Sequence, residues 1–529
     1  MLTEEANNET TAPQSTVHRT LGSKIIRNVV FGGLRYVFVL PIPFVMTPLI
    51  LHKVGVAGYG TWAVFLAINS LTSLADLGLV GTLSKFVAEY HARQDFPALA
   101  RLVNSGLSLF LAIDLVIATS LWLATPLLAR MLFHGSTVPS AELVMLLRFF
   151  LLVIAANILI QLFASVTTGL QRLDLTNMMS AMQTLLSAVC GGILLLQGWG
   201  LRGLVYGYIA SAILTVLGYL VLVRRLLPTI ILNPAGFDVS EARHMLGFSL
   251  RLYLTQAAVA VHNQVEKVFL AMLVGVDPVG WYDIASDVAL KARGSIGFIL
   301  SPVLPAASEL NALGDQSRMR ELYHRSHKYL ALFGVPAVLY LAAISHRFVE
   351  LWLGTALTMV AVPLSILVIV NFVNLASGPG FLILAGCGYM EPGVRSATLG
   401  IVLNIVLSFA LIYKFGFAGA VLGTSLSLLV ASGYFMFLFH RHTGYSLSRV
   451  IVESYLKPVL ISVLVLVTIF VIHPSSTMSW FALAATGLIF AASYCLIILL
   501  SGFFDDYDWI KLESYLSVAR YARRVARLA

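Results

Sequence analysis

The chain has 529 residues, of which 59% are hydrophobic and only 11% charged, and its formal net charge is +9. A soluble protein of this size needs roughly a quarter of its residues charged to cover its surface, so the composition excludes a soluble globular protein and indicates a membrane protein. In a soluble protein the positive charge would suggest a nucleic-acid partner. Membrane orientation explains it here, so we predict no nucleic-acid partner.

Apolar runs long enough to cross a bilayer recur along the chain, since about 20 helical residues span the hydrocarbon core. Six lie within residues 28–223, six within residues 245–440 and two within residues 441–501, and a polar linker at 224–244 separates the two sets of six. We therefore predict an all-α polytopic membrane protein with about fourteen transmembrane helices, in two pseudo-symmetric six-helix lobes plus two C-terminal helices. The predicted crossings lie near residues 28–51, 60–83, 103–129, 143–168, 178–197, 203–223, 245–274, 279–306, 329–345, 358–386, 394–413, 418–439, 458–473 and 478–501.

Lysine and arginine are concentrated in every second connection between these crossings. Basic residues near crossing ends are retained in the cytoplasm, so we expect both termini to be cytoplasmic. We expect residues 1–27 to form a disordered cytoplasmic tail, because residues 1–23 are polar and rich in Thr, Asn and Glu. We do not interpret them as a signal peptide, since no short apolar core with a small-residue cleavage site follows them. Residues 502–529 predict a basic amphipathic tail that either anchors to anionic lipid headgroups or stays solvated. Its basic face contains Arg520, Arg523, Arg524 and Arg527.

The two halves of the chain repeat each other loosely. Leu250-Arg251 echoes Leu34-Arg35, Val274-Gly275-Val276 echoes Val54-Gly55-Val56, and Gly280-Trp281 echoes Gly58-Tyr59. Internal repeats around a site at the membrane midplane are typical of transporters.

Arg35 and Arg251 therefore occupy corresponding places, about two turns into the first helix of each half. A guanidinium binds phosphate through a planar, bidentate fork, so the pair predicts an anionic head group bound in a central cavity. The alternative is that both side chains extend to the cytoplasmic interface. Lys267 is expected only to mark the outer end of its helix.

Acidic residues inside the crossings are candidates for ion coupling. Asp283, Asp287 and Lys291 are spaced at i, i+4 and i+8 and share one helix face. Asp287 and Lys291 can form an intrahelical ion pair; alternatively, Lys291 belongs to the cationic cavity and Asp283 is free for a coupling Na⁺ or proton. Asp76 and Asp114 in the first half can either bind that ion or form a structural hydrogen bond.

No pattern for an enzyme or a metal site accompanies these charges. Cys190, Cys387 and Cys495 lie in apolar runs without metal-ligand or disulfide spacing, and neither a P-loop nor a GxSxG motif is present. Residues 505–508 (Asp-Asp-Tyr-Asp) suggest a transferase metal site only superficially, and we interpret them as the solvated start of a helix. We expect no enzymatic activity and no cofactor other than a coupling ion.

Several segments resemble a known family. Residues 55–62 (Gly-Val-Ala-Gly-Tyr-Gly-Thr-Trp), 74–79 (Leu-Ala-Asp-Leu-Gly-Leu) and 86–89 are similar to the opening of the polysaccharide repeat-unit flippases. Residues 169–174 and 279–285, with Pro302-Val303-Leu304-Pro305, fit the same pattern. These flippases, the O-antigen and exopolysaccharide exporters, belong to the multidrug, oligosaccharidyl-lipid and polysaccharide exporter superfamily.

The resemblance implies a bacterial inner-membrane protein with two six-helix lobes. It implies that an undecaprenyl-diphosphate-linked oligosaccharide is moved from the cytoplasmic to the periplasmic leaflet by alternating access, coupled to a cation gradient. Membrane lipids, a polysaccharide polymerase and export machinery are the implied partners. A cationic cavity meets the diphosphate in relatives, and Arg35, Arg251 and Lys291 are the residues that we match to it by charge and depth.

Two other functions compete with this interpretation. A drug or cation antiporter of the same fold would need an acidic or aromatic cavity, which the buried basic residues do not favour. A membrane-embedded glycan polymerase would need a large periplasmic loop with catalytic residues, whereas the predicted outer loops have ordinary connection lengths.

Overall fold

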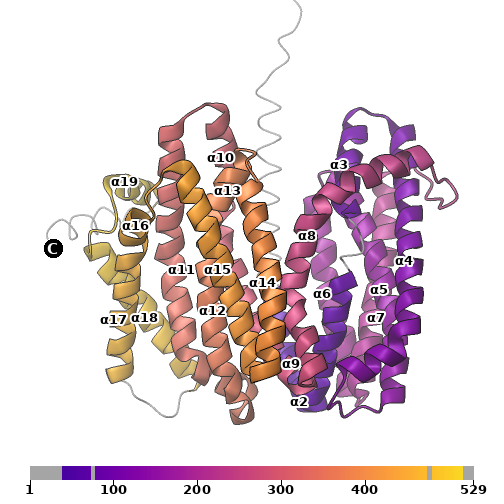
Figure 1. Cartoon of the computed structure of the whole chain (residues 1–529), viewed down its shortest axis with the longest axis horizontal. Helices are drawn as coiled ribbons and strands as arrows, with labels where there is room; N and C mark the ends of the chain where they lie inside the picture. Colours follow the sequence, from indigo (N-terminus) through magenta and orange to yellow (C-terminus); the bar gives the residue numbers. More distant parts are fainter. Residues whose placement is uncertain (1–38, 73–77, 473–478, 516–529) are drawn as a thin grey trace, which may run out of the picture. The chain divides into compact units, whose positions relative to one another are not determined.

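A computed structural model of the chain describes residues 39–72, 78–472 and 479–515, with side chains for all of these except 247, 248, 250–263, 512, 514 and 515. Within these ranges every regular element is a helix (Figure 1), so the prediction of an all-α protein is confirmed. The elements are α2 (Pro41–Thr72), α3 (Leu79–Ala92), α4 (Phe96–Leu132), α5 (Ser140–Gly169), α6 (Leu173–Leu196), α7 (Gly200–Leu226), α8 (Val239–Leu273), α9 (Val276–Gly297), η2 (Phe298–Leu300), α10 (Val303–Ala312), α11 (Gln316–Leu353), η3 (Thr355–Val360), α12 (Ala361–Leu375), α13 (Gly378–Gly386), α14 (Glu391–Phe415), α15 (Phe417–Thr443), α16 (Leu447–Val450), η4 (Ile451–Leu456), α17 (Lys457–Ile472), α18 (Trp480–Leu500) and α19 (Asp506–Tyr515).

Among the described residues, 11 helical stretches are long and apolar enough to cross a membrane. The polytopic prediction is confirmed, and the predicted number of crossings is consistent with this set. The helices α8 and α9, on which the seventh and eighth predicted crossings lie, fall outside it because of their polar and charged content. The charged residues of α9 are Asp277, Asp283, Asp287, Lys291 and Arg293.

The chain divides into two compact units that are not continuous in sequence. The first comprises Met1–Lys53, Thr72–Thr125 and Ala141–Leu254, and the second comprises Val54–Leu71, Pro126–Ser140 and Thr255–Ala529. The helices α2, α4 and α8 therefore each run from one unit into the other. The predicted lobes at residues 28–223 and 245–440 differ from these units in three short segments, 54–71, 126–140 and 245–254. The predicted lobe boundaries stay a prediction.

In the first unit, α4 to α7 run alongside one another (Figure 1). Helices α6 and α7 approach closely through glycines, because a Cβ added to Gly207 would lie 2.3 Å from the backbone nitrogen of Gly191. Small residues commonly allow such an approach between membrane helices. The side chains of Gln183 on α6 and Asn157 on α5 form a hydrogen bond of 2.8 Å, so polar as well as apolar contacts join this unit.

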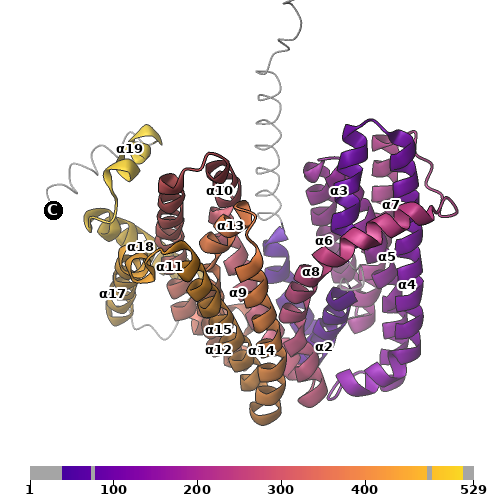
Figure 2. The same cartoon turned by 45° about the horizontal axis from the view of Figure 1, so that its top comes forward.

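In the second unit, the two helices beyond the predicted lobes, α17 and α18, pack against α11 (Figure 2). Pro336 lies inside α11, and a proline removes the backbone donor for the carbonyl four residues earlier. That carbonyl belongs to Leu332, and the Tyr494 hydroxyl of α18 donates to it at 2.9 Å. A side chain of the additional pair thus satisfies the backbone group that the proline leaves open.

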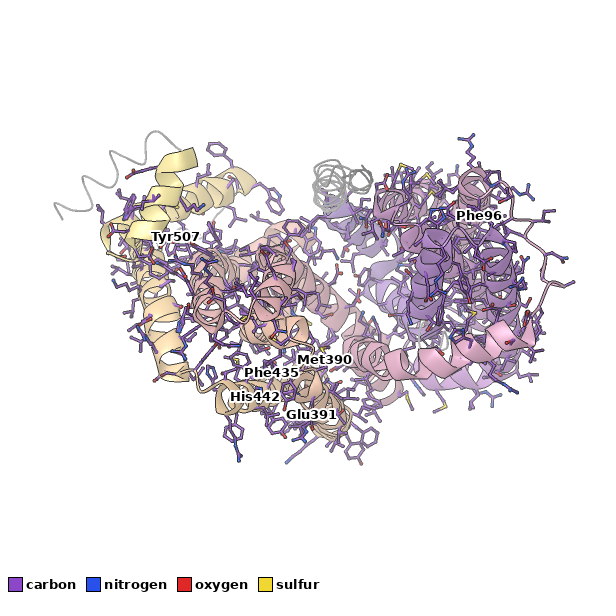
Figure 3. The ribbon with its side chains drawn as sticks, turned by 90° about the horizontal axis from the view of Figure 1, so that it is seen from above. Phe96, Met390, Glu391, Phe435, His442 and Tyr507 are labelled. Carbon is purple, nitrogen blue, oxygen red and sulfur yellow. The ribbon has the colours of Figure 1, made fainter. Side chains whose placement is uncertain are left out.

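The antiparallel neighbours α14 and α15 form another part of the second unit. Figure 3 looks onto the end at which α14 begins and α15 ends, and labels Glu391 on the first helix and His442 on the second. At the opposite end the two helices are joined at Gly416, whose φ of 57° suits a glycine.

The sequence repeat that pairs residues 54–56 with residues 274–276 is matched by similar backbone angles at its two glycines. Both glycines lie in the second unit, the first within α2 and the second just before α9. Gly55 has φ 72° and ψ −179°, and Gly275, its partner in the repeat, has φ 130° and ψ 179°. This combination is essentially restricted to glycine. Each glycine precedes a helical segment, and a Cβ added to Gly60 on the first segment would lie only 1.8 Å from the Val276 carbonyl oxygen on the second. The absence of a side chain at Gly60 therefore permits this contact.

Candidate functional site: buried charges of the second unit

Glu266 and Lys267, near the C-terminal end of α8, begin two separate polar clusters within the second unit. Consecutive residues of a helix point about 100° apart, so the two side chains face different neighbours. Glu266 faces α14 and α15, whereas Lys267 faces α9. The prediction that Lys267 only marks a helix end is wrong, because its side chain is 11% exposed and carries an ion pair.

The Glu266 carboxylate is completely buried and accepts hydrogen bonds from uncharged side chains. The Asn404 side-chain nitrogen, the Thr424 hydroxyl at 2.7 Å and the Ser408 hydroxyl at 3.4 Å all donate to its Oε1 atom. The Tyr282 hydroxyl of α9 lies 2.7 Å from the Thr424 oxygen and extends the chain of hydrogen bonds. We call Glu266, Tyr282, Asn404, Ser408 and Thr424 the Glu266 cluster.

Among the described side chains, the second oxygen of the same carboxylate, Glu266 Oε2, has no hydrogen-bond partner, and neither has the Asn404 Oδ1 atom. Buried polar atoms usually have a hydrogen-bond partner in the protein, in an ordered water or in a bound ion. Glu266 Oε2 could bind a proton. Together with Asn404 Oδ1 it could instead bind a hard cation, because hard cations prefer oxygen ligands. Within the described ranges no three His, Cys, Asp or Glu residues gather to hold a metal, so a cation here would rely on one carboxylate and neutral oxygens.

Asp283 on α9 belongs to the other cluster and is fully paired. Lys267 Nζ lies 2.6 Å from its Oδ1 atom, and the Tyr59 hydroxyl donates to its Oδ2 atom at 2.7 Å. In the structure Asp283 is therefore not free for a coupling ion, contrary to that alternative. Both carboxylate oxygens of Asp283 have partners, which is the usual condition of an ion pair inside a membrane protein.

One turn further along α9, Asp287 and Lys291 form an ion pair. This is the intrahelical pair that the sequence offered as one alternative. The exposed fractions of the two side chains are 43% for Asp287 and 22% for Lys291, so the pair is more accessible than the one at Asp283. Lys291 remains available to contact an anionic ligand through its other donors.

The remaining predicted site residues are described only in part. Arg35 and Asp76 lie outside the described residues, and Arg251 lies on α8 in the stretch for which no side chains are described. Asp114 on α4, in the first unit, is buried, and its Oδ1 atom has no hydrogen-bond partner within the part of the chain that the structure describes. Of the proposed phosphate-binding residues, only Lys291 therefore has a described side chain.

The sequence interpretation did not include Glu266 among the candidate site residues, although a carboxylate in an apolar run was visible. A second signal was available on α14, where Asn404 and Ser408 are one turn apart within an otherwise apolar stretch, residues 399–412. Polar residues at this spacing commonly hydrogen-bond across membrane helices. The identity of the partner helix could not be deduced from either signal alone.

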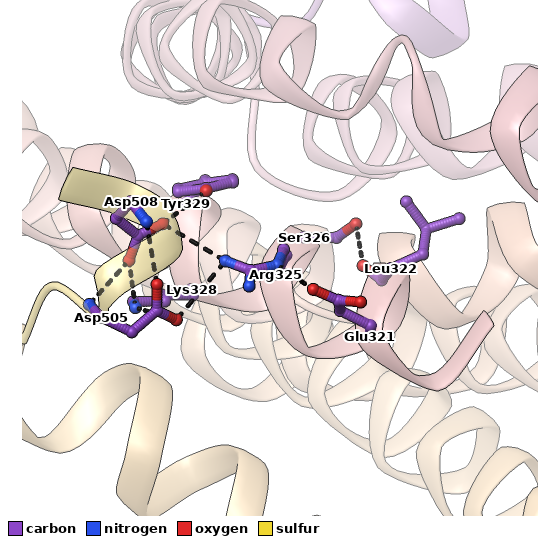
Figure 4. A network of polar contacts seen from close by, with 8 residues as sticks. All are labelled: Glu321, Leu322, Arg325, Ser326, Lys328, Tyr329, Asp505 and Asp508. Atoms are coloured by element: carbon purple, nitrogen blue, oxygen red, sulfur yellow. Dashed lines mark hydrogen bonds and ion pairs between the residues drawn. The ribbon is translucent and has the colours of Figure 1, made fainter. Parts of the chain in front are cut away.

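Beyond the last membrane span, α19 is joined to α11 by ion pairs (Figure 4). Arg325 Nη1 lies 3.3 Å from an oxygen of Asp508, Lys328 pairs with the other oxygen, and the Tyr329 hydroxyl donates to Asp508 at 2.7 Å. Asp505 precedes the helix and exchanges hydrogen bonds with the backbone and side chain of Asp508. Residues 505–508 do begin a helix, but the expectation that they are solvated is wrong for Asp508, whose side chain is 3% exposed.

Comparison with known sequences supplies several matches. A family model described as "Polysaccharide biosynthesis protein" matches residues 56–361, more than half of the chain. "Probable flippase AglR" of Haloferax volcanii is 22% identical over 404 residues, which cover 73% of this chain and 78% of that protein. An "Uncharacterized membrane protein in cps region" of Klebsiella pneumoniae is 28% identical over 185 residues, and the match covers only 38% of its length.

Comparison with solved structures supplies the fold. "Lipid II flippase MurJ, inward closed conformation" superposes with a TM-score of 0.73 at 16% identity, covering 89% of this chain and 97% of that one. An inward-facing multidrug resistance MATE family transporter of the MOP superfamily superposes with a TM-score of 0.62 at 16% identity, covering 77% and 98%. These likenesses show the fold and confirm the predicted architecture.

Proposed function

Because the chain belongs to the polysaccharide biosynthesis protein family, we propose that it flips a lipid-linked oligosaccharide across a membrane by alternating access. Two of its relatives, both from Haloferax volcanii, are named as probable flippases, and MurJ, which has the same fold, is a lipid II flippase by its title. Polysaccharide repeat units are assembled on lipid carriers, so flipping is the transport step that this family assignment favours. We expect no enzymatic activity.

The observation that carries the proposal is a set of ionisable side chains on α8 and α9 that lie between the helices of the second unit. A charged side chain at the centre of a bilayer costs at least about 2.5–3.5 kcal/mol, so such groups usually face protein or a water-filled pathway and mark a substrate or ion route. Glu266, Lys267, Asp283, Asp287 and Lys291 are residues of this kind. A scaffold without transport would not need them.

We further propose that the cargo is an undecaprenyl-diphosphate-linked repeat unit. Lys291, with Arg35 and Arg251, would contact the diphosphate, since ammonium and guanidinium groups both bind phosphate. The protein would then act in a bacterial inner membrane with both termini in the cytoplasm, and would supply substrate to a polysaccharide polymerase and export machinery.

We also propose that a coupling Na⁺ or proton binds at the Glu266 cluster instead of at Asp283. Glu266 Oε2 and Asn404 Oδ1 are the open oxygens of this cluster, and a cation bound there would offset the cost of burying the carboxylate. Asp114 is a second candidate for a proton in the first unit, because it is also buried with an open oxygen. Asp287, which is paired but accessible, is a weaker one.

A drug or cation antiporter is the second candidate function. The likeness in fold to multidrug transporters and the buried carboxylate of Glu266 favour it. Lys267 and Lys291 disfavour it, because basic groups along the route would repel a cationic drug.

The decisive experiment is deletion of the gene followed by extraction of membrane lipids. Accumulation of diphosphate-linked repeat units on the cytoplasmic side supports flipping, whereas unpolymerised units already outside would indicate a polymerase. An antiporter would instead change drug sensitivity and leave the lipid-linked pool unaltered. Complementation with Lys291→Gln should fail to clear the pool, while Lys414→Gln, at an exposed basic position of α14, should clear it.

A further inference from the structure

A pocket of about 390 Å³ lies at the end of the second unit where α14 begins and α15 ends (Figure 3). It is separate from the Glu266 cluster, which lies further along both helices. Its lining consists of Tyr389, Glu391, Pro392, Arg395, Leu438, Arg441 and His442. Nothing in the flipping mechanism proposed above uses these residues.

The lining is rich in cationic donors. Arg395 forms an ion pair with Glu391, with 2.5 Å between Nη2 and Oε1. A guanidinium has five N–H donors, so this contact orients Arg395 and leaves several of its donors available. Arg441 has no carboxylate partner among the described residues, and two arginines therefore face one glutamate in the same pocket.

Aromatic stacking gives the pocket a fixed wall. The rings of Tyr389 and His442 stack with centroids 4.4 Å apart and an interplanar angle of 20°. This contact joins the connection before α14 to the last turn of α15. The imidazole is thereby held beside Arg441, where it adds a further hydrogen-bond donor or acceptor.

The pocket also lies at the boundary of two membrane spans, because the spans Glu391–Phe415 and Phe417–Thr443 both reach this end. Large apolar side chains close to it in sequence are exposed, at 43% for Met390, 51% for Val394 and 57% for Phe437. An anion-binding pocket next to an apolar surface matches a molecule with a phosphate head and acyl chains.

We propose that this pocket binds the phosphate of an anionic membrane phospholipid. The head-group phosphate contacts Arg395 and Arg441, and the acyl chains lie along the exposed apolar residues. The inference goes beyond the transported substrate and is independent of it. The guanidinium pair supplies the affinity for phosphate, and the apolar surface selects a lipid over free phosphate.

The test measures lipid binding to the purified full-length protein by native mass spectrometry. The probes are phosphatidylglycerol, zwitterionic phosphatidylcholine and inorganic phosphate. Arg441→Gln and Arg395→Gln should each weaken the tightest phosphatidylglycerol adduct by about tenfold, since each removes a charge-assisted contact. Lys414→Gln is the matched control, because it removes an exposed positive charge at the other end of α14, and it should leave that adduct unchanged.

Three outcomes would overturn the lipid assignment. Equal binding of phosphatidylglycerol and phosphatidylcholine, or equal loss in all three variants, would mean that no specific phosphate contact exists. Binding of inorganic phosphate without any preference for phosphatidylglycerol would assign the pocket to a soluble phosphate. Arg441→Lys keeps the charge but loses the bidentate fork, so an intermediate loss in this variant supports the site even if Arg441→Gln folds poorly.

Discussion

The Glu266 cluster and the junction between α11 and α19 hold buried carboxylates in opposite ways. Glu266 is surrounded by neutral donors that all reach one oxygen, and its other oxygen is open. Asp508 is as deeply buried but is paired with Arg325 and Lys328 and bonded to Tyr329.

This difference is the reason why we propose a coupling role for Glu266 and a structural role for Asp508. A carboxylate with cationic partners is already neutralised, and removing one partner strongly destabilises the protein. A carboxylate with neutral partners and an open oxygen can gain or lose a proton or a cation, which is what coupling requires. Burial alone therefore does not identify the functional acid, whereas the charge and number of its partners do.

The largest expected effect is that of Glu266→Gln on transport. The amide keeps the size of the side chain but removes the charge, so the open position can no longer attract a cation or exchange a proton. Transport of the lipid-linked substrate should fall by about 100-fold, which corresponds to the loss of a charged interaction of about 3 kcal/mol. The assay measures flipping in proteoliposomes, with Thr424→Ser, which retains a hydroxyl, as control. Wild-type transport by Glu266→Gln would remove the distinction between the two regions.

Gly60→Ala should affect stability most. The added Cβ would lie 1.8 Å from the Val276 carbonyl oxygen, so the α2 segment and α9 must separate, and the neighbouring Tyr59 loses its position against Asp283. We expect the free energy of unfolding in detergent to fall by about 3 kcal/mol, at the upper end for overpacked sites. Gly433→Ala is the matched control, because no atom lies within 4 Å of a Cβ there. Equal stability of both variants would refute the close approach.

Asp508→Ala should lower stability by about 2 kcal/mol, since it removes the shortest ion pair of Lys328 and one of the ion pairs of Arg325, while both cations stay partly accessible to water. Hydrogen exchange of residues 506–515 should increase, and transport should change little. Glu453→Ala is the matched control, because it removes the exposed ion-pair partner of Arg449. It should lower stability by only about 0–1 kcal/mol, which is the contribution of such surface pairs. If Asp508→Ala instead abolished transport at unchanged stability, the junction would be functional.

The smallest expected effect is the pH dependence of the α19 attachment. Burial by itself would raise the pKa of Asp505, but the backbone N–H of Asp508 and the charges of Lys328 and Arg325 outweigh burial and hold that pKa below its ordinary value. A lowered pKa means that the carboxylate stabilises the folded state above the ordinary value and loses this contribution as the pH falls through the lowered one.

The attachment should therefore be constant from neutral pH down to about pH 5 and weaken below about pH 4. Hydrogen exchange of residues 506–515, corrected for its intrinsic pH dependence, measures this change. Asp505→Asn should remove the pH dependence. A transition near pH 6 would instead point to a histidine and contradict the assignment to Asp505.

Much of the architecture could be predicted from residue order, because local rules decide it. The length of apolar runs determines which segments can cross a bilayer, and the glycines at positions 55 and 275 mark equivalent breaks in the two halves because only glycine adopts their backbone angles. The pairing of Asp287 with Lys291 was also foreseeable, since four residues of helix bring the two side chains together.

The clusters that join distant segments could not be predicted in the same way. Whether Asp283 is free or paired depends on Lys267 and Tyr59, which approach it from other helices. The open oxygen of Glu266 depends on how α14 and α15 orient Asn404 and Thr424 around it. Composition and periodicity thus determined that this is a helical membrane protein with charges inside its spans. Only the tertiary structure decided which charges are neutralised, because the partner of a buried charge is set by helix packing across hundreds of residues and not by spacing along one helix.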